Sequence, residues 1–169
     1  MRHLSPHRVG RHGRPSSRGL TLVELMVGLA IGAFLMLTAA PYFTDYIANS
    51  KLREGGNLLY AEALLAQSEA VKRNTTVRLT TAGNTVTITD RTVPATPVTL
   101  RTRTFTNNVS AAAADIDFGS EGRPVPFGTA GSVNLAMDGV TCSGEFRCPG
   151  LRVDAGGAVR LCGNHLSGC

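Results

Sequence analysis

The stretch Arg18-Gly19-Leu20-Thr21-Leu22-Val23-Glu24-Leu25 opens an apolar run that continues through Ala40 and stops at Pro41. From Leu20 to Ala40 the run holds twenty-one residues, and its only charge is Glu24. At about 1.5 Å rise per residue, a helix of that length spans the ~30 Å hydrocarbon core of a bilayer. The sequence therefore predicts a transmembrane helix over residues 20–41.

Two simpler interpretations of this run compete: a cleaved secretory signal ending near Thr38-Ala39-Ala40, and a plain single-pass anchor. Against the first, the run exceeds the ~7–15 apolar residues of a secretory signal, and Pro41 would follow the cut. A carboxylate inside a membrane costs about 2.5–3.5 kcal/mol and usually has a partner and a function. Glu24 therefore needs an explanation of its own.

The order of residues around Glu24 resembles the class III signal of type IV prepilins and pseudopilins. It consists of a basic leader ending in Gly19, then Leu20, Thr21, two apolar residues and Glu24. The resemblance implies that a prepilin peptidase cuts between Gly19 and Leu20, that Leu20 becomes N-methylated, and that Pro41 kinks the helix. A carboxylate in hydrocarbon needs a positive partner, and the freed α-amino group of a neighbouring subunit supplies one. Glu24 would thus direct helix packing during assembly.

The positive charge of the chain belongs largely to residues 1–19. The formal net charge is +5, and five arginines and three of the four histidines lie in this segment. Without them, twelve Lys and Arg face twelve Asp and Glu. The segment has no apolar face to bury, so we expect it to be disordered. Its charge should keep this end cytoplasmic and send the rest of the chain across the inner membrane into the periplasm.

Residues 42–74 form the second predicted segment, an amphipathic helix without proline. Leu59, Ala63, Ala66 and Ala70 recur at helical spacing, with Leu58 and Leu65 widening the stripe. Gly55-Gly56 weakens the helix by up to ~1 kcal/mol per residue, which predicts a bend or local melting there.

The end of this segment is similar to the FimT/GspH branch of minor pilins. The resemblance lies in Leu65-Ala66-Gln67-Ser68-Glu69-Ala70-Val71-Lys72-Arg73-Asn74, with Gln67 where that branch often has Arg.

Residues 75–169 read as a series of short strands, which we expect at 76–81, 85–90, 98–105, 116–118, 133–137, 151–154 and 158–162. The turn signals Ala82-Gly83-Asn84 and Ala155-Gly156-Gly157 join neighbouring strands. Strands that follow one another through short turns form antiparallel sheets. The predicted fold class is therefore α+β, with a long amino-terminal helix packed on an antiparallel β domain, as in pilins.

The four cysteines, Cys142, Cys148, Cys162 and Cys169, lie near the carboxyl end of a domain expected outside the inner membrane. Oxidising compartments favour disulfides, and four cysteines allow three pairings. Proximity along the chain favours Cys142–Cys148 with Cys162–Cys169, whereas a hairpin centred on Ala155-Gly156 would bring Cys148 near Cys162. A zinc site that includes His165 does not fit a usual finger spacing. We expect no metal, no cofactor and no enzyme activity.

DNA is a candidate partner because FimT-like minor pilins are associated with uptake of transforming DNA through a basic Gly-Arg-x-Arg-like motif. The matching stretch here is Gly157-Ala158-Val159-Arg160, in which Ala158 replaces the first arginine. Arg147, Arg152 and Arg160 are close in sequence. If they neutralised three phosphates, the logarithm of the DNA-binding constant would fall with the logarithm of the salt concentration with a slope of about −2.7, called the salt slope below. The alternative interpretation is a set of solvated arginines on an edge hairpin.

Three functions share this pattern. The first is a minor pilin, a structural and assembly subunit of a type IV pilus whose partners are other pilins, the prepilin peptidase and the inner membrane. The second is a receptor for double-stranded DNA in natural transformation. The third, a type II secretion pseudopilin, has the same predicted fold and processing as the first.

Overall fold

The computed structural model describes residues 19–167 and residue 169. The expectations for the leader, its disorder and its cytoplasmic charge, lie outside the described residues apart from Gly19. The described elements are the helix α1 (Leu22–Arg73) and the strands β1 (Val77–Gly83), β2 (Thr85–Asp90), β3 (Val98–Thr104), β4 (Val109–Phe118), β5 (Gly131–Met137), β6 (Gly150–Val153) and β7 (Val159–Cys162).

The chain divides into two compact units, residues 1–40 and residues 41–169. Helix α1 contributes to both units, because it is assigned without a break from Leu22 to Arg73. The two predicted segments 20–41 and 42–74 are thus parts of a single helix. The kink implied at Pro41 stays a prediction.

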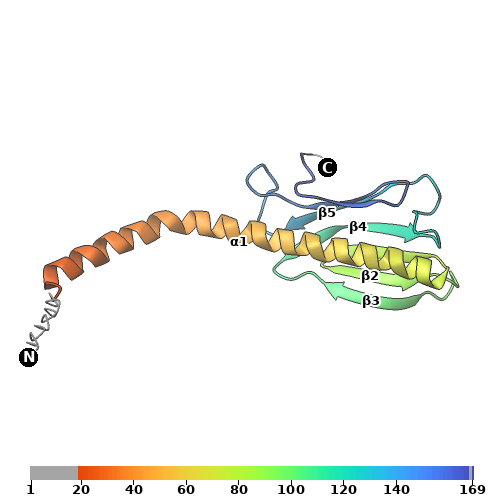
Figure 1. Ribbon diagram of the computed structural model, residues 1–169, viewed down its shortest axis with the longest axis horizontal. Helices are drawn as coiled ribbons and strands as arrows, with labels where there is room; N and C mark the ends of the chain where they lie inside the picture. Colours follow the sequence, from red (N-terminus) through yellow and green to blue (C-terminus); the bar gives the residue numbers. More distant parts are fainter. Residues whose placement is uncertain (1–18, 168) are drawn as a thin grey trace, which may run out of the picture. The chain divides into compact units, whose positions relative to one another are not determined.

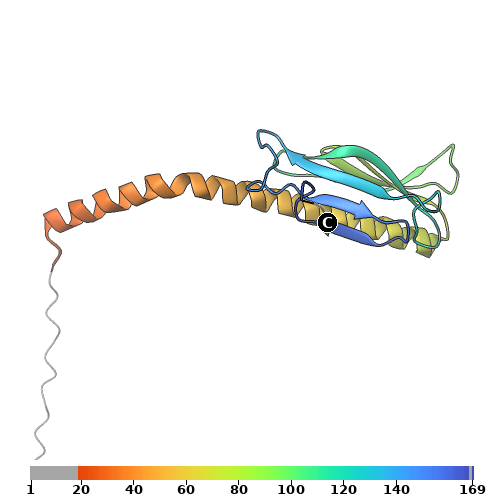
Figure 2. The ribbon, with the colours of Figure 1, turned by 90° about the horizontal axis from the view of Figure 1, so that it is seen from above.

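The strands of the second unit form one antiparallel sheet in the order β3-β2-β1-β4-β5-β6-β7. The helix residues of this unit run along one face of the sheet (Figure 1). Strands β5, β6 and β7 curve around one side of the helix (Figures 1 and 2). The α+β class and the antiparallel arrangement predicted from the sequence are confirmed. Strands β3 and β7 are the two edges, so the cysteine-rich carboxyl end lies at one border of the sheet.

The strand predictions agree closely except at β4. Strand β2 has the predicted bounds, and the others shift by one or two residues. Strand β4 begins at Val109, seven residues before the expected start at Ile116. The missed part contains four consecutive alanines, which have low strand propensity. They are held in the strand because β1 pairs with them, as in the partners Thr81 and Ala114.

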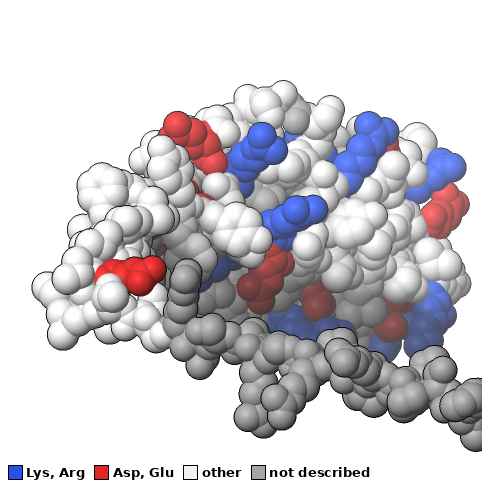
Figure 3. Space-filling view, turned by 60° about the vertical axis from the view of Figure 1, so that its left-hand side comes forward, with Lys and Arg blue, Asp and Glu red and all other residues white. Residues whose placement is uncertain are grey.

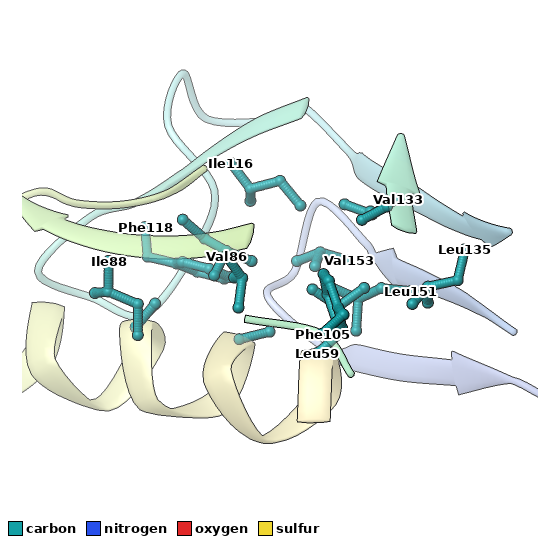
Figure 4. Close-up of a cluster of buried hydrophobic side chains, with 14 of the residues drawn as sticks. Leu59, Val86, Ile88, Phe105, Ile116, Phe118, Val133, Leu135, Leu151 and Val153 are labelled. Atoms are coloured by element: carbon teal, nitrogen blue, oxygen red, sulfur yellow. The ribbon is translucent and has the colours of Figure 1, made fainter. Parts of the chain in front are cut away.

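The hydrophobic core lies between α1 and the sheet. The predicted stripe Leu59, Ala63, Ala66 and Ala70 is fully buried, and Leu58 and Leu65 pack against it at the margin. Figure 4 shows strand side chains such as Val86, Phe118 and Leu151 converging on the helix. Because three of the four stripe residues are alanines, the helix backbone can come close to the sheet.

The local melting predicted at Gly55-Gly56 does not occur, whereas the bend given as its alternative stays a prediction. Helix α1 is continuous through both glycines, and both are buried. A Cβ at Gly55 would lie 2.8 Å from Cγ1 of Val109, and one at Gly56 would lie 2.8 Å from Cβ of Pro149. The glycines therefore serve close packing between the helix and the sheet, which offsets their low helix propensity.

The helix ends in a Schellman motif at Asn74, one residue after Arg73. Asn74 has a φ of 52°, the left-handed conformation that asparagine tolerates at this position. The N–H of Thr75 donates to the carbonyl of Ala70 at 3.2 Å, and the N–H of Asn74 donates to that of Val71 at 3.3 Å. The motif turns the chain directly into β1.

Candidate assembly helix and carboxyl-terminal arginine surface

The first unit contains an apolar helix segment without protein cover. Leu22–Ala39 is long and apolar enough to cross a membrane, and none of that window is buried. Leu22, Phe34 and Leu37 expose 74%, 67% and 77% of their surfaces. Exposing this much apolar surface to water is costly at about 25 cal/mol per Å². The segment therefore requires lipid or neighbouring helices around it.

The start of this helix is capped by Thr21. The N–H of Glu24 donates to Oγ1 of Thr21 at 3.2 Å, and the N–H of Leu25 donates to the Thr21 carbonyl at 3.1 Å. Thr21 is thus the N-cap, and Glu24 occupies the third helical position, where its negative charge complements the helix dipole. The Thr-x-x-Glu spacing is typical of a capping box. This spacing is visible in the sequence, but the prediction above treats Glu24 only as an assembly residue. Glu24 has this local role whether or not a partner amine binds it.

Two disulfides bind the carboxyl-terminal segment, joining Cys142 to Cys148 and Cys162 to Cys169. The structure thus has the pairing favoured by proximity along the chain. With the four thiols paired, they are not free as zinc ligands or nucleophiles. Among the described residues, no group of three or more His, Cys, Asp and Glu side chains is placed to hold a metal.

Asn49 of α1 fastens the Cys142–Cys148 loop to the helix. Its Nδ2 donates to the Glu145 carbonyl at 2.9 Å, and its Oδ1 accepts from the Arg147 N–H at 2.9 Å. Both ends of the side-chain amide are used, so the loop is held in one register against the helix. This contact spans almost one hundred residues of sequence, and no local pattern could have indicated it.

Gln67 makes a second connection between α1 and distant loops. Its Nε2 donates to the carbonyls of Gly122 at 2.6 Å and Gly157 at 2.7 Å. Gly157 has a φ of 91°, and a Cβ there would lie 2.5 Å from the Gly122 carbonyl oxygen. The family resemblance presents Gln67 as a missing positive charge. The structure shows that position 67 is a donor to two loop carbonyls, and that Gly157 has a packing role.

The three candidate DNA-binding arginines fall into two groups. Arg152 and Arg160 are direct cross-strand partners on β6 and β7, and they line one hollow of about 280 Å³. Arg147 lines a different hollow, of about 590 Å³, together with Asn49 and Arg53 of α1. The structure therefore brings Arg152 and Arg160 together across β6 and β7, whereas Arg147 belongs to neither of these strands.

Both arginines of the pair have protein partners. Nη2 of Arg160 lies 3.3 Å from Oδ2 of Asp154, and Nη1 of Arg152 donates to the Leu151 carbonyl at 2.8 Å. Asp154 also accepts from the N–H groups of Gly156 and Ala158, at 3.0 and 2.9 Å, which fixes the β6–β7 turn. A phosphate approaching this hollow would meet one carboxylate beside two guanidinium groups.

Elsewhere on the domain, several charged side chains form ion pairs. Over the face shown in Figure 3, positive and negative side chains are interspersed. Arg78 makes two 2.7 Å bonds to the carboxylate of Asp117, and this hydrogen bonding raises the pKa of Arg78. A hydrogen bond from Arg73 lowers the pKa of Glu69. The buried Glu62 of α1 lies 3.1 Å from Nε of Arg101 and 3.7 Å from Nε of Arg103, both on the edge strand β3.

An apolar amino-terminal helix that continues into an antiparallel β domain defines the class of type IV pilin-like proteins. Residues 14–40 match the model of the prokaryotic N-terminal methylation motif, and residues 56–164 match that of the type II transport protein GspH. The second match covers more than half of the chain, and the protein therefore belongs to the GspH family. It is a minor pilin or pseudopilin, and proteins of this class assemble with other pilins.

Solved structures of the same fold include a minor pilin of a type IV pilus and a minor pseudopilin of a type II secretion system. The type IV minor pilin FimU of Pseudomonas aeruginosa is 19% identical, with a TM-score of 0.55 over 66% of this chain and 88% of FimU. The minor pseudopilin EpsH from the type 2 secretion system of Vibrio cholerae is 12% identical. Its TM-score is 0.54 over 67% of this chain and 97% of EpsH. No curated protein matches the chain.

Proposed function

We propose that the protein is a minor pilin, a low-abundance assembly subunit of a type IV pilus. In this proposal the prepilin peptidase cuts between Gly19 and Leu20, Leu20 is N-methylated, and Glu24 binds the α-amino group of a neighbouring subunit. The observation that carries the proposal is the capped, unburied apolar helix segment that lies within the residues matching the methylation motif. A subunit with this helix has a surface for lipid before assembly and for other helices after it.

The proposed location is the inner membrane, with the β domain in the periplasm. The five arginines of the leader favour a cytoplasmic amino terminus. The two disulfides support an oxidising compartment for the β domain. Once the leader is cut, the side-chain charges of residues 20–169 sum to zero, so the positive charge of the chain is a property of the leader.

Replacing Glu24 tests the assembly step. Glu24→Ala should leave cleavage by the peptidase intact but reduce incorporation into sheared fibres, measured by immunoblot of the fibre fraction against the membrane fraction. Thr21→Ala is the matched control for the capping role, because it removes the hydroxyl that caps the helix and retains the carboxylate. Wild-type incorporation of Glu24→Ala would refute the pairing.

The type II secretion pseudopilin is the alternative favoured by the GspH description of the family. The two systems differ in what is lost when the gene is deleted. Deletion of a pilus subunit should reduce surface pili and leave secretion of exoproteins unchanged, whereas deletion of a pseudopilin should do the reverse. Counting pili by electron microscopy and assaying exoproteins in the culture medium of the same deletion strain separates the two.

DNA capture is a second candidate function, supported by the adjacent Arg152 and Arg160 on β6 and β7. Two neutralised phosphates give a salt slope of about −1.8, smaller than the slope of about −2.7 expected for three. A gel shift with double-stranded DNA at two salt concentrations measures this slope. Binding that is unchanged in the double variant Arg152→Gln, Arg160→Gln would exclude this surface.

A further inference from the structure

An exposed aromatic group lies on α1 just after the apolar segment. Tyr42, Phe43 and Tyr46 expose 79%, 64% and 71% of their surfaces. Among the described residues, no side chain or backbone group gives either tyrosine hydroxyl a hydrogen bond, and neither ring contacts another ring or a cation. We call these three residues the aromatic collar.

The collar lies on the side of α1 turned away from the sheet. At about 100° per residue, its three members fall within an arc of roughly 100°. The residues that α1 buries in this region, Ala48 and Leu52, lie about 150° from the centre of that arc by the same rotation. The described residues of the β domain therefore leave the collar uncovered, so its occupant lies outside that domain.

We propose that the aromatic collar binds the phospholipid headgroup layer on the periplasmic side of the inner membrane and sets the depth of the subunit before assembly. The proposal rests on the membrane anchoring proposed above. The collar is continuous with the anchor, because Tyr42 follows Ala39, the last residue of the apolar window, by three positions. Three residues reach at most about 11 Å, so Tyr42 stays near the end of the span.

The dimensions of the collar fit this layer. Tyr42 and Tyr46 are separated by about 6 Å of helix rise, and each interfacial layer of a bilayer is about 5–7 Å deep. Tyrosine has an apolar ring and a hydroxyl that needs a polar partner, which is why it is enriched at this depth. Asp45, the charged residue among the collar positions, falls about 105° from the centre of the arc and outside it. A headgroup layer provides apolar contacts for the rings and hydrogen-bond partners for the hydroxyls.

The chain offers a clean test because it contains no tryptophan. Tyr42→Trp and Tyr46→Trp each place one indole in the collar, and two other variants provide references. Phe34→Trp marks the apolar segment. Phe127→Trp marks an exposed aromatic position, 75% exposed, in the loop after β4. That loop lies near the carboxyl end of α1, since Gly122 within it accepts from Gln67.

The full chain of each variant is reconstituted in phosphatidylcholine vesicles containing lipids brominated either near the carbonyl end or near the methyl end of the acyl chains. The collar variants should show blue-shifted emission and lose more of it to the shallow quencher than to the deep one. Phe34→Trp should be quenched more by the deep lipid, and Phe127→Trp by neither.

Two results would overturn the proposal. Collar indoles that are as unquenched as Phe127→Trp, while Phe34→Trp is quenched, would reject the collar and leave membrane anchoring intact. Collar indoles quenched more by the deep lipid would place these residues inside the hydrocarbon and reject a headgroup site. An unquenched Phe34→Trp would refute the anchoring itself, and the collar with it.

Discussion

The amide of Gln67 should be a main determinant of domain stability, because one nitrogen holds two loops that are far apart in the sequence. Gln67→Glu keeps the size of the side chain but replaces the donor by a carboxylate, which faces the carbonyls of Gly122 and Gly157 at 2.6 and 2.7 Å. Each hydrogen bond contributes about 0.5–1.5 kcal/mol, and an acceptor facing an acceptor adds repulsion. We expect a loss of about 2–3 kcal/mol in the free energy of unfolding at neutral pH.

Urea unfolding of the full chain in detergent, followed by circular dichroism, measures this loss. Ser68→Ala is the matched control, because among the described residues the neighbouring hydroxyl bonds only to the Leu65 carbonyl of its own helix turn, and its change should stay within about 0.5 kcal/mol. Gln67→Arg should recover most of the stability, since a guanidinium can donate to both carbonyls. Equal stability of Gln67→Glu and wild type at neutral pH would refute the two-carbonyl role of this residue.

Three further predictions concern the packing and charges of the same domain. Gly55→Val should lower the free energy of unfolding by about 1–3 kcal/mol through overpacking against β4, measured as a lower urea midpoint; an unchanged midpoint would show that the helix can move away. Glu62→Gln should cost about 1–2 kcal/mol, because its buried carboxylate contacts both β3 arginines, which are partly solvated; the loss should shrink in high salt, and a salt-independent loss would contradict the ionic origin. The hydroxyl of Thr92 lowers the pKa of Asp90 by hydrogen bonding, so this stabilisation is present at neutral pH and is lost as the pH falls below about 4. When the pH is lowered through this range, the melting temperature of Thr92→Val should decrease less than that of the wild type. Identical pH profiles of the two melting temperatures would exclude the Thr92–Asp90 hydrogen bond.

The helical half of the fold could be predicted because its signals are local. The stripe from Leu59 to Ala70 has helical period, and burial of one face follows from that period alone. The limits of β2 were also local, since turn residues bound an alternating segment. By contrast, the alanines at the start of β4 carry no strand signal, and their pairing with β1 is a tertiary effect.

The membrane-length helix could be predicted from the sequence, whereas the arrangement of the carboxyl-terminal arginines could be predicted only in part. The spacing from Gly19 to Glu24 is a local signal, so the sequence alone was enough to indicate the family. The division of the tail arginines between two hollows could not be read from the sequence, because it depends on how Asn49 holds the loop that carries Arg147. The packing roles of Gly55 and Gly157 likewise depend on neighbours far away in the chain.

The central claim is that the chain is a processed prepilin, and the mass of its mature form tests this most directly. The full chain is expressed with and without a prepilin peptidase, purified from membranes and measured by intact mass and amino-terminal peptide spectrometry. The account predicts a mature chain that begins at N-methylated Leu20, and retention of the leader in a variant with a bulky residue at Gly19. A chain that keeps residues 1–19 in the presence of an active peptidase would contradict it.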